Sequence, residues 1–342
     1  MPDSHHRVTI KEVAARAGVS VATISRVING KGPVRESTSR RVMETAQAMR
    51  YTPHGVARSL SMRRAHTVGL LLPDLHGEFF SEVIRGIDAE ARRSGYHLLV
   101  SGFHSDQEEM TAVFRAVRGR VDGLIVMSPE RESAVLCADL PAGLPIVLLN
   151  NLSGAARTIA IDNYGGAVAM VKHLLGIGHR RIAFIKGPEQ NADACERLRG
   201  YRDAIGAAAL LELDGDFSEE AGHRAAVDLL QLEHRPSAIF AANDAMAIGA
   251  LSALREARVA VPHEIALCGF DDIPIARYVT PPLTTVNVAI AELGRRAFEV
   301  LERRLQDGGE DNQREILPTT LVIRESCGAR MRSEKRYRGG AQ

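Results

Sequence analysis

The chain has 342 residues, of which 45% are hydrophobic and 25% charged, values typical of a globular protein of two or three domains. This composition excludes a wholly disordered, collagen-like or disulfide-stapled chain, and no apolar run approaches the roughly 18 residues that cross a bilayer. The N-terminal segment lacks the continuous apolar core of a secretory signal. We therefore expect a cytoplasmic protein with no membrane partner.

Charge is unevenly distributed, although the formal net charge is only +1. Residues 1–64 carry 12 Lys and Arg against 4 Asp and Glu, whereas residues 65–325 carry 26 against 37. A basic head on an acidic body predicts an anionic partner for the head, and nucleic acid is the obvious candidate. On charge alone, a chance fluctuation or an RNA-binding segment is an equal alternative.

Enzyme and metal signatures are absent from the sequence. We find no GxSxG, HExxH, Walker phosphate loop or GxGxxG motif, and the histidines are scattered without ligand spacing. The cysteines form no CxxC pair or Cys/His cluster, which predicts reduced thiols. We expect neither an enzyme, nor a cofactor, nor a metal site. The four cysteines are Cys137, Cys195, Cys268 and Cys327.

The basic head begins with a short amphipathic helix predicted over 10–17. Thr9 is a good N-cap, and apolar residues follow at the spacing i, i+3, i+4, i+7. Gly18 is expected to end the helix in the left-handed conformation that glycine tolerates.

A second helix is predicted over 21–28, capped by Ser20, and a third over 38–49 completes a small core. Two short helices joined by a glycine-containing turn form the unit that places its second helix in the DNA major groove. A purely structural helix pair is the alternative, which the basic charge disfavours.

The segments VTIKEVAARAGVSVATISRVINGKGPVRESTSRRV and YTPHGVARSL resemble the DNA-binding headpiece of the lac/gal repressor family. The resemblance implies that Val21 and Ala22 face base edges, where they would contact thymine methyl groups. Arg26 is the exposed side chain of that helix able to pair with guanine O6 and N7. The side chains expected to bind phosphates are Thr9, Ser20, Thr23, Ser25 and Asn29.

After the headpiece, a further short helix is predicted over 54–61. An isolated eight-residue helix is marginal, so a frayed interdomain linker is the alternative. The resemblance implies a hinge helix that orders on DNA and inserts Leu60 into the minor groove, with Ala57 packed beside it. Two positions depart from the family pattern and put one backbone and one phosphate contact in doubt: His54 replaces the usual Asn, and Ser39 the usual Arg.

From residue 67 onward, short apolar strands alternate with amphipathic helices in two rounds, the second opening near residue 162. This alternation predicts parallel sheets covered on both faces, arranged as two doubly wound lobes. The predicted strands are 68–72, 96–102, 121–127, 145–150, 181–187, 237–243, 265–270, 284–288 and 321–326. The predicted helices are 79–94, 107–118, 164–177, 196–208, 219–230, 245–256 and 289–304.

Ligands of open α/β sheets bind beyond the carboxyl ends of the strands. The body resembles the effector domain of the same family, itself similar to periplasmic sugar-binding proteins, through VDGLIVM, IDNYGGA, GHRRIAFIKGP, ERLRGYRDA, FAANDAMAIGAL and GFDDIPIARYVTPPLTTV. The resemblance, which covers about 7–326, implies that Arg197, Asn243 and Asp271 are polar effector contacts. The other candidates are Asp193 and Phe240, at positions that vary with the effector, Phe79 and Phe80, in a loop that closes over the ligand, and the strand-end residue Asp74.

These residue types suit a polyol or sugar. Asp accepts hydrogen bonds from hydroxyl groups, Arg donates them and Asn does both, while an aromatic side chain covers the apolar face of the sugar ring. A purine or another small metabolite is the alternative ligand. Structural roles are open as well: Asp271 and Asp272 as turn caps, Asn243 as a helix N-cap, and Arg197 as a surface ion pair.

The predicted organisation is an all-α helix-turn-helix headpiece over 1–52, a hinge helix and linker over 53–64, and a two-lobed α/β effector-binding and dimerisation domain over 65–326. Residues 327–342 form a basic tail expected to be disordered. The predicted function is a homodimeric transcriptional regulator, expected to be a repressor. It would bind a pseudo-palindromic operator in double-stranded DNA under the control of a small molecule, expected to be a sugar, held between the lobes. The alternative is a periplasmic-type sugar-binding protein without a DNA function.

Overall fold

The computed structural model describes residues 8–28, 33–51, 65–103, 107–128, 143–151, 157–206, 210–308 and 313–329. The chain divides into two compact units, residues 1–67 with 117–122, and residues 68–116 with 123–342. The predicted hinge helix over 54–61 and the tail beyond residue 329 lie outside the described residues. The predicted domain limits therefore stay predictions.

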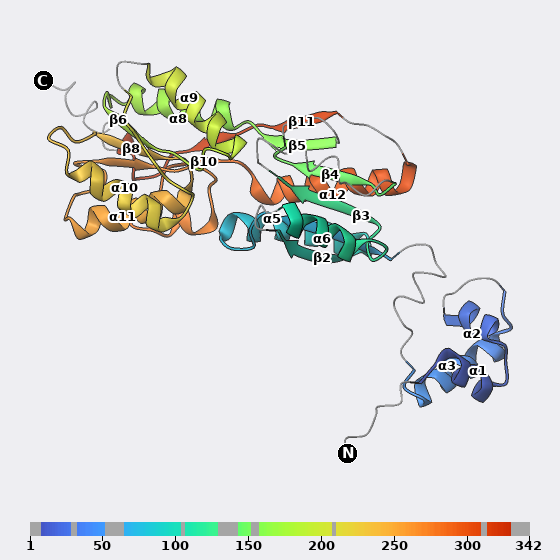
Figure 1. The fold of residues 1–342 in the computed structure, drawn as a ribbon. Helices are drawn as coiled ribbons and strands as arrows, with labels where there is room; N and C mark the ends of the chain where they lie inside the picture. Colours follow the sequence, from blue (N-terminus) through green and yellow to red (C-terminus); the bar gives the residue numbers. More distant parts are fainter. Residues whose placement is uncertain are drawn as a thin grey trace, which may run out of the picture. The chain divides into compact units, whose positions relative to one another are not determined.

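The headpiece consists of the three predicted helices, α1 (Ile10–Ala17), α2 (Val21–Ile28) and α3 (Glu36–Ala48), drawn in blue in Figure 1. Thr9 and Glu12 form a capping box at the start of α1, in which each side chain bonds the other residue's backbone N–H. Gly18 ends α1 at φ 63°, the left-handed conformation predicted for it. The predicted bounds of α1 and α2 are confirmed.

A small apolar core joins the three helices. Val13 of α1, Ile24 of α2 and Val42 of α3 are fully buried and pack together. Helix α3 begins at Glu36, two residues before the predicted start, with an acidic side chain in its first turn, where the helix dipole favours it.

The first lobe of the body is built on a six-stranded sheet with the order β11-β5-β4-β3-β1-β2. The register from β11 through β5, β4 and β3 to β1 is parallel, as predicted. Two of its strands, β5 and β11, were missed by the sequence pattern. The strands are β1 (Thr67–Leu72), β2 (His97–Gly102), β3 (Gly123–Met127), β4 (Ile146–Leu149), β5 (Arg157–Ile161) and β11 (Arg314–Leu317). The helices are α5 (Glu78–Arg93), α6 (Gln107–Val117) and α12 (Ile290–Asp307).

The second lobe contains a parallel four-stranded sheet with the order β7-β6-β8-β9 and a separate antiparallel pair, β10 and β12. The prediction of parallel sheets throughout is therefore wrong for this pair. The strands are β6 (Ile182–Ile185), β7 (Glu212–Leu213), β8 (Ala238–Ala241), β9 (Ala266–Cys268), β10 (Thr285–Asn287) and β12 (Thr320–Val322). The helices are α8 (Asn163–Gly176), α9 (Ala192–Ile205), α10 (Glu219–Leu230), α11 (Asp244–Glu256) and the 3-10 helix η2 (Pro274–Arg277).

The chain passes between the two lobes three times, after β5, after β10 and after β11. As a result, α12 belongs to the first lobe, although it follows the whole second round of strands and helices. Figure 1 shows α12 alongside β3 and β4. Its closest helical neighbour is α5, where Gly86 and Gly294 allow the two backbones to approach.

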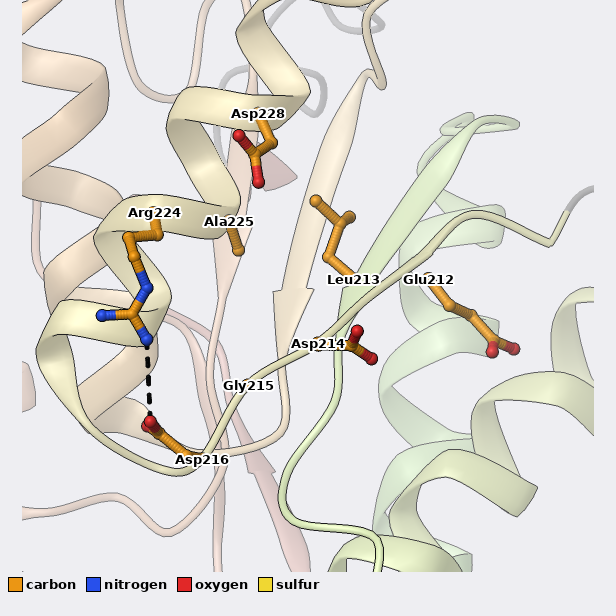
Figure 2. A pocket seen from close by; sticks show the side chains of 8 residues that line it. All are labelled: Glu212, Leu213, Asp214, Gly215, Asp216, Arg224, Ala225 and Asp228. Atoms are coloured by element: carbon orange, nitrogen blue, oxygen red, sulfur yellow. Dashed lines mark ion pairs between the residues drawn. The ribbon is translucent and has the colours of Figure 1, made fainter.

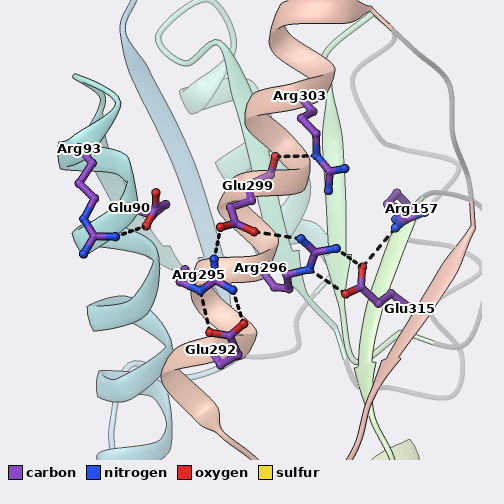
Figure 3. Close-up of polar contacts among 9 residues, drawn as sticks. All are labelled: Glu90, Arg93, Arg157, Glu292, Arg295, Arg296, Glu299, Arg303 and Glu315. Atoms are coloured by element: carbon purple, nitrogen blue, oxygen red, sulfur yellow. Dashed lines mark hydrogen bonds and ion pairs between the residues drawn. The ribbon is translucent and has the colours of Figure 1, made fainter.

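Hydrogen bonds and ion pairs between charged side chains attach α12 and β11 to the first lobe, as Figure 3 shows. Glu315 of β11 accepts hydrogen bonds from Arg296 Nε of α12 at 2.8 Å and from Arg157 Nη2 of β5 at 3.2 Å. One carboxylate thus joins α12 and β11, which are consecutive in the chain, to β5, which is far from both in sequence. Within the described ranges, no helix is both long and apolar enough to cross a membrane.

The contact between α5 and α12 generates a stability prediction. A Cβ at Gly86 would lie 2.0 Å from the backbone oxygen of Ala291, so Gly86→Ala must force the helices apart. We expect the free energy of unfolding to fall by about 1–3 kcal/mol, measured by urea denaturation. Gly176→Ala at the end of α8 is the control, because no atom lies within 4 Å of its added Cβ. It should be neutral or slightly stabilising, and an equal loss in both variants would contradict the close-approach argument.

Candidate functional site

The outward face of α2 carries the residues predicted to read DNA bases. Val21 is 41% exposed, and Ala22 and Arg26 are also exposed, while Ile24 between them is fully buried. Because Ile24 packs into the core of the headpiece, the opposite face of α2 must point toward solvent. The structure therefore presents the two apolar side chains and the guanidinium on the surface of the headpiece.

The hydroxyl groups predicted to bind phosphates lie at helix starts. Ser20 Oγ accepts a hydrogen bond from Thr23 N at 3.1 Å and lies 2.9 Å from Thr23 Oγ1, so it caps α2. Thr9 caps α1 in the same way, and Ser25 is half-buried within α2. The N-terminal end of a helix attracts anions, which suits phosphate binding at both caps. Asn29, Ala57 and Leu60 lie outside the described residues, and their roles stay predictions.

Arg197 forms the centre of a buried polar cluster in the second lobe. It lies on α9, its side chain is 4% exposed, and its Nε donates to Asn163 Oδ1 at 2.8 Å. Its Nη1 donates to the backbone oxygen of Ala242 at 2.6 Å, and its Nη2 lies 3.0 Å from Asp271 Oδ1. The guanidinium also lies 4.0 Å from the ring centroid of Phe270. The surface ion pair considered for Arg197 is therefore wrong.

Asp271 meets Arg197 from the loop after β9. Its side chain is 7% exposed, and its backbone has φ 111°, which side-chain-bearing residues rarely adopt. Burial raises the pKa of Asp271 to about 6, and the Arg197 charge opposes that rise. Within the described part of the chain, Oδ1 has no hydrogen-bond partner of good geometry, although it faces Arg197 as an ion pair. It remains a buried acceptor.

Asp193 lies beside this pair, in the first turn of α9. The helix begins at Ala192, four residues before the predicted start, because the Asn191 side chain caps it by accepting from Ala194 N. Asn163 Nδ2 donates to Asp193 Oδ1 at 2.8 Å. Burial raises the pKa of Asp193 to about 7, the Arg197 charge lowers it, and the Asp271 charge raises it further.

Two asparagines of this cluster were missed by sequence reasoning. Asn163, 3% exposed, bonds both Arg197 and Asp193. Asn150, 2% exposed, follows β4 of the first lobe, and its side-chain hydrogen bond lowers the pKa of Asp193. Among the described residues no hydrogen-bond partner reaches Asn150 Oδ1, a second buried acceptor. Asn150 ends the predicted strand 145–150, so its position could have been found from the sequence, whereas Asn163 follows β5, a strand that the pattern missed.

Asn243 occupies the structural role that the sequence also allowed. It is the N-cap of α11, where Oδ1 accepts from Met246 N at 2.9 Å. Its Nδ2 donates to the backbone oxygen of Phe217 at 3.0 Å. Both polar ends of the half-buried amide are therefore engaged within the protein, and a ligand contact at Asn243 stays a prediction.

Phe240 does not join the cluster. It lies in β8, is fully buried, and packs edge-on against Phe184 with ring centroids 5.1 Å apart. Successive side chains of a strand point to opposite faces, and Phe240 points into the apolar core. We correct the expectation that its ring covers a ligand.

The first-lobe candidates lie at the start of α5. Phe79 and Phe80 are half-buried, with ring centroids 5.6 Å apart in an edge-to-face arrangement. Asp74 is exposed, and its Oδ1 accepts from His76 N at 2.9 Å, which closes a local turn. Their predicted contacts with an effector stay predictions.

A cavity of about 500 Å³ lies elsewhere in the second lobe, between the end of β7 and α10 (Figure 2). Its lining is acidic, and most of its carboxylates already have cationic partners, such as Asp216 with Arg224 at 3.7 Å and Asp214 with Lys186 at 2.7 Å. None of the predicted site residues lines it. We therefore base the candidate site on the Arg197 cluster. The lining residues are Glu212, Leu213, Asp214, Gly215, Asp216, Arg224, Ala225 and Asp228.

Two observations on the described residues concern metal binding and the cysteines. In those residues, no group of three His, Cys, Asp or Glu side chains could hold a metal ion. Cys195, Cys268 and Cys327 are free thiols there. Cys137 lies outside the described residues.

Comparison with known proteins gives two family matches. Residues 9–54 match a model described as bacterial regulatory proteins, lacI family, and residues 171–327 match a periplasmic binding protein-like domain. The ribose operon repressor of Escherichia coli (strain K12) is 35% identical over 329 residues, covering 93% of this chain and 99% of that protein.

Solved structures agree with these matches. A lac repressor dimer bound to operator and the anti-inducer ONPF has a TM-score of 0.84 and 28% identity, covering 94% of this chain and 99% of that one. A lacI-family regulator from Enterococcus faecium with bound ribose has a TM-score of 0.70 and 26% identity, covering 76% of this chain and 98% of that one.

The raised pKa values predict a pH dependence of stability. Because Asp193 and Asp271 have pKa values above the ordinary 3.8, these two groups bind more protons in the folded than in the unfolded chain between about pH 4 and pH 7. Their contribution to the free energy of unfolding should therefore fall as pH rises through that window. Asp193→Asn removes one such group, while its amide oxygen still accepts from Asn163. We expect a flatter profile and a gain of about 1–2 kcal/mol at pH 8 by urea denaturation.

The control for this titration is Asp228→Asn, which neutralises an exposed carboxylate of α10. It should leave the profile parallel to that of the unmodified protein. A profile for Asp193→Asn that also stays parallel would show that Asp193 ionises normally in the folded chain.

Proposed function

The chain belongs to the lacI family of bacterial regulatory proteins, and from this membership we propose that it is a transcriptional repressor whose operator affinity is controlled by a small sugar. The observation that carries the proposal is the match to a ribose operon repressor over nearly the whole length of both chains. It is combined with a headpiece whose α2 presents Val21, Ala22 and Arg26 outward. The proposed role is regulatory rather than catalytic. Acting on operator DNA, the protein would function in the cytoplasm.

On DNA, α2 would lie in the major groove. Val21 and Ala22 would contact thymine methyl groups, and Arg26 would pair with a guanine. The caps at Thr9 and Ser20, with Thr23 and Ser25, would hold phosphates and set the position of the helix. Two headpieces of a homodimer would read two half-sites of a pseudo-palindrome, with Leu60 of each hinge inserted at its centre beside Ala57.

The Arg197 cluster supports a sugar as the effector. A ring of hydroxyl groups needs several acceptors and a few fixed donors close together. Asp271 Oδ1 and Asn150 Oδ1 are buried acceptors of this kind in the described structure, and Arg197 is a fixed donor next to Asp271. The two known relatives whose descriptions mention ribose make D-ribose the first ligand to test. Phe79 and Phe80 would cover the apolar face of the ring.

The DNA proposal is tested by selecting bound sequences from random duplex DNA with the full-length protein. We expect a pseudo-palindrome with half-sites about one helical turn apart and a flexible pyrimidine–purine step at its centre. Single unpaired half-sites would keep the DNA function but contradict the paired hinge. No enrichment, with or without added metabolites, would favour a sugar-binding protein without a DNA function.

Arg26 is predicted to specify one base pair of each half-site. Arg26→Ala should weaken binding to the selected operator by about 1–3 kcal/mol and relax the preference for guanine at a single position, measured by repeating the selection. Arg40→Ala on α3 removes an exposed arginine that pairs with Glu36 at 3.5 Å. That control should leave the selected sequence unchanged. Loss of preference at every position in Arg26→Ala would instead indicate a phosphate contact.

Arg197 is predicted to bind the effector through a geometry that lysine cannot reproduce. Arg197→Lys keeps the charge but loses the fork that reaches Asn163, Ala242 and Asp271. We expect at least a roughly tenfold loss of D-ribose affinity by calorimetry. Arg199→Lys, on the exposed side of α9 with Glu196 as its partner, is the matched control and should bind normally. A bound purine instead of ribose would redirect the assignment to the alternative ligand.

A further inference from the structure

Two adjacent aspartates after β9 point to different parts of the molecule. Asp271 faces Arg197, with 3.0 Å between Oδ1 and Nη2. Asp272 accepts from Arg324 Nη2 at 2.6 Å and from Asn287 Nδ2 at 2.8 Å. The side chain of Asp272 is 6% exposed, so this second carboxylate is as well shielded from water as the first. One peptide unit therefore connects the candidate effector site to a separate buried network.

The backbone between them is held in an unfavourable conformation. Asp271 has φ 111° and Asp272 has φ 58°, both in the region that favours glycine. Such a turn persists only where its surroundings fix it. Here Asp271 N donates to the Val286 backbone oxygen at 2.8 Å, and Ile273 N donates to Asp244 Oδ2 at 2.9 Å. Because the turn has little freedom, a shift of one aspartate displaces the other.

Asn287 connects this turn to the passage between the lobes. It is the last residue of β10, and its backbone lies opposite Asp271 in a parallel bridge. While its Nδ2 donates to Asp272, its Oδ1 accepts from Ala289 N at 2.9 Å. Ala289 has φ 48° and is the N-cap of α12, with no side-chain cap of its own. Both ends of one amide thus join the Asp272 carboxylate to the start of α12.

Helix α12 is firmly attached to the first lobe. Gly86 of α5 packs against Ala291 in the first turn of α12. Further along, Arg304 Nη1 donates to the backbone oxygen of Ile146, the first residue of β4. A displacement at the start of this helix is therefore applied to the first lobe rather than absorbed in a loose connection.

We propose that Asp272 and Asn287 form a relay that carries the state of Asp271 to the start of α12 and so couples effector binding to the first lobe. The proposal rests on the proposed function, since it takes Asp271 as the group that meets the effector. Asp272 and Asn287 act through other groups and are positioning residues. If they served only to stabilise the fold, their removal would lower stability without changing how α12 responds to Asp271.

Hydrogen exchange of the full-length, ligand-free protein tests the relay without knowledge of the effector. Asp271→Asn weakens the pair with Arg197, and we expect at least a roughly threefold faster exchange in a peptide covering 288–294. Asn287→Ala should raise exchange there as well, and the double variant should exchange no faster than Asn287→Ala alone, because contacting residues on one path are not additive. Additive effects, or no effect of Asp271→Asn on this peptide, would overturn the proposal.

The matched control is Ser218→Ala, which also removes a side-chain acceptor at a helix start, since Ser218 Oγ accepts from Ala221 N at 3.1 Å. It caps α10, outside the relay. Its effect should be confined to the start of α10, and Asp271→Asn should act on 288–294 in this background as it does in the unmodified protein. Loss of the Asp271→Asn effect in the control would show that general destabilisation, and not the relay, is responsible.

A second arm measures operator affinity with and without D-ribose. Asn287→Ala should keep its ribose affinity within about threefold, while the ribose-dependent change in operator affinity falls to less than about one third of that of Ser218→Ala. Coupling between two ligands is reciprocal, so the operator should change ribose affinity by the same reduced factor. Unreduced coupling overturns the relay. If no sugar changes operator binding of the unmodified protein, the sugar assignment fails, and the exchange experiment alone decides the relay.

Discussion

The burial of one permanent positive charge constrains the second lobe. Guanidinium groups stay charged in proteins, and taking one out of water costs several kcal/mol unless partners compensate. Here the partners come from the start of α8, the loop after β8 and the loop after β9, represented by Asn163, Ala242 and Asp271. Parallel strands bring their carboxyl ends to the same edge of a sheet, which is why the loops after β8 and β9 reach one side chain. Asn163 arrives from a different sheet, at the passage that leaves β5 of the first lobe.

The same charge organises an excess of acceptors. Asp193, Asp271 and Asp244 are three carboxyls with raised pKa values in one region, and Arg197 lowers the pKa of the first two. Asp244 already accepts hydrogen bonds from Thr285 Oγ1 and Ile273 N, so it supports the loop after β9 rather than facing a ligand. A polyol supplies the hydroxyl donors that the other two can accept. The asymmetry between acceptors and donors therefore favours an uncharged, hydroxyl-rich effector over an anionic one.

The connectivity of the lobes gives this site a route to the rest of the body. Because α12 and β11 return to the first lobe after most of the second lobe has been formed, three separate passages of the chain connect the two lobes. A movement of one lobe relative to the other must bend all three. The charged network of Glu315 with Arg296 and Arg157 and the tight approach at Gly86 hold α12 in place in the first lobe. A relative movement of the lobes would therefore bend the chain at the short passages, one of which begins after Asn287.

The sequence alone determined the features that depend on neighbours along the chain. The capping box at Thr9, the left-handed Gly18 and the helical spacing of apolar residues fixed α1 and α2 to the residue, since these signals act within one or two turns. Arg197, Asp193 and Asp271 were nominated by the family resemblance, which placed them beyond the ends of predicted strands. Only the tertiary structure decided that β10 and β12 pair antiparallel, that β5 and β11 complete the first sheet, and that Phe240 faces the core while Asn163 and Asn150 join the site. Strand pairing and the face that a side chain presents depend on partners in other segments of the chain, which local periodicity does not contain.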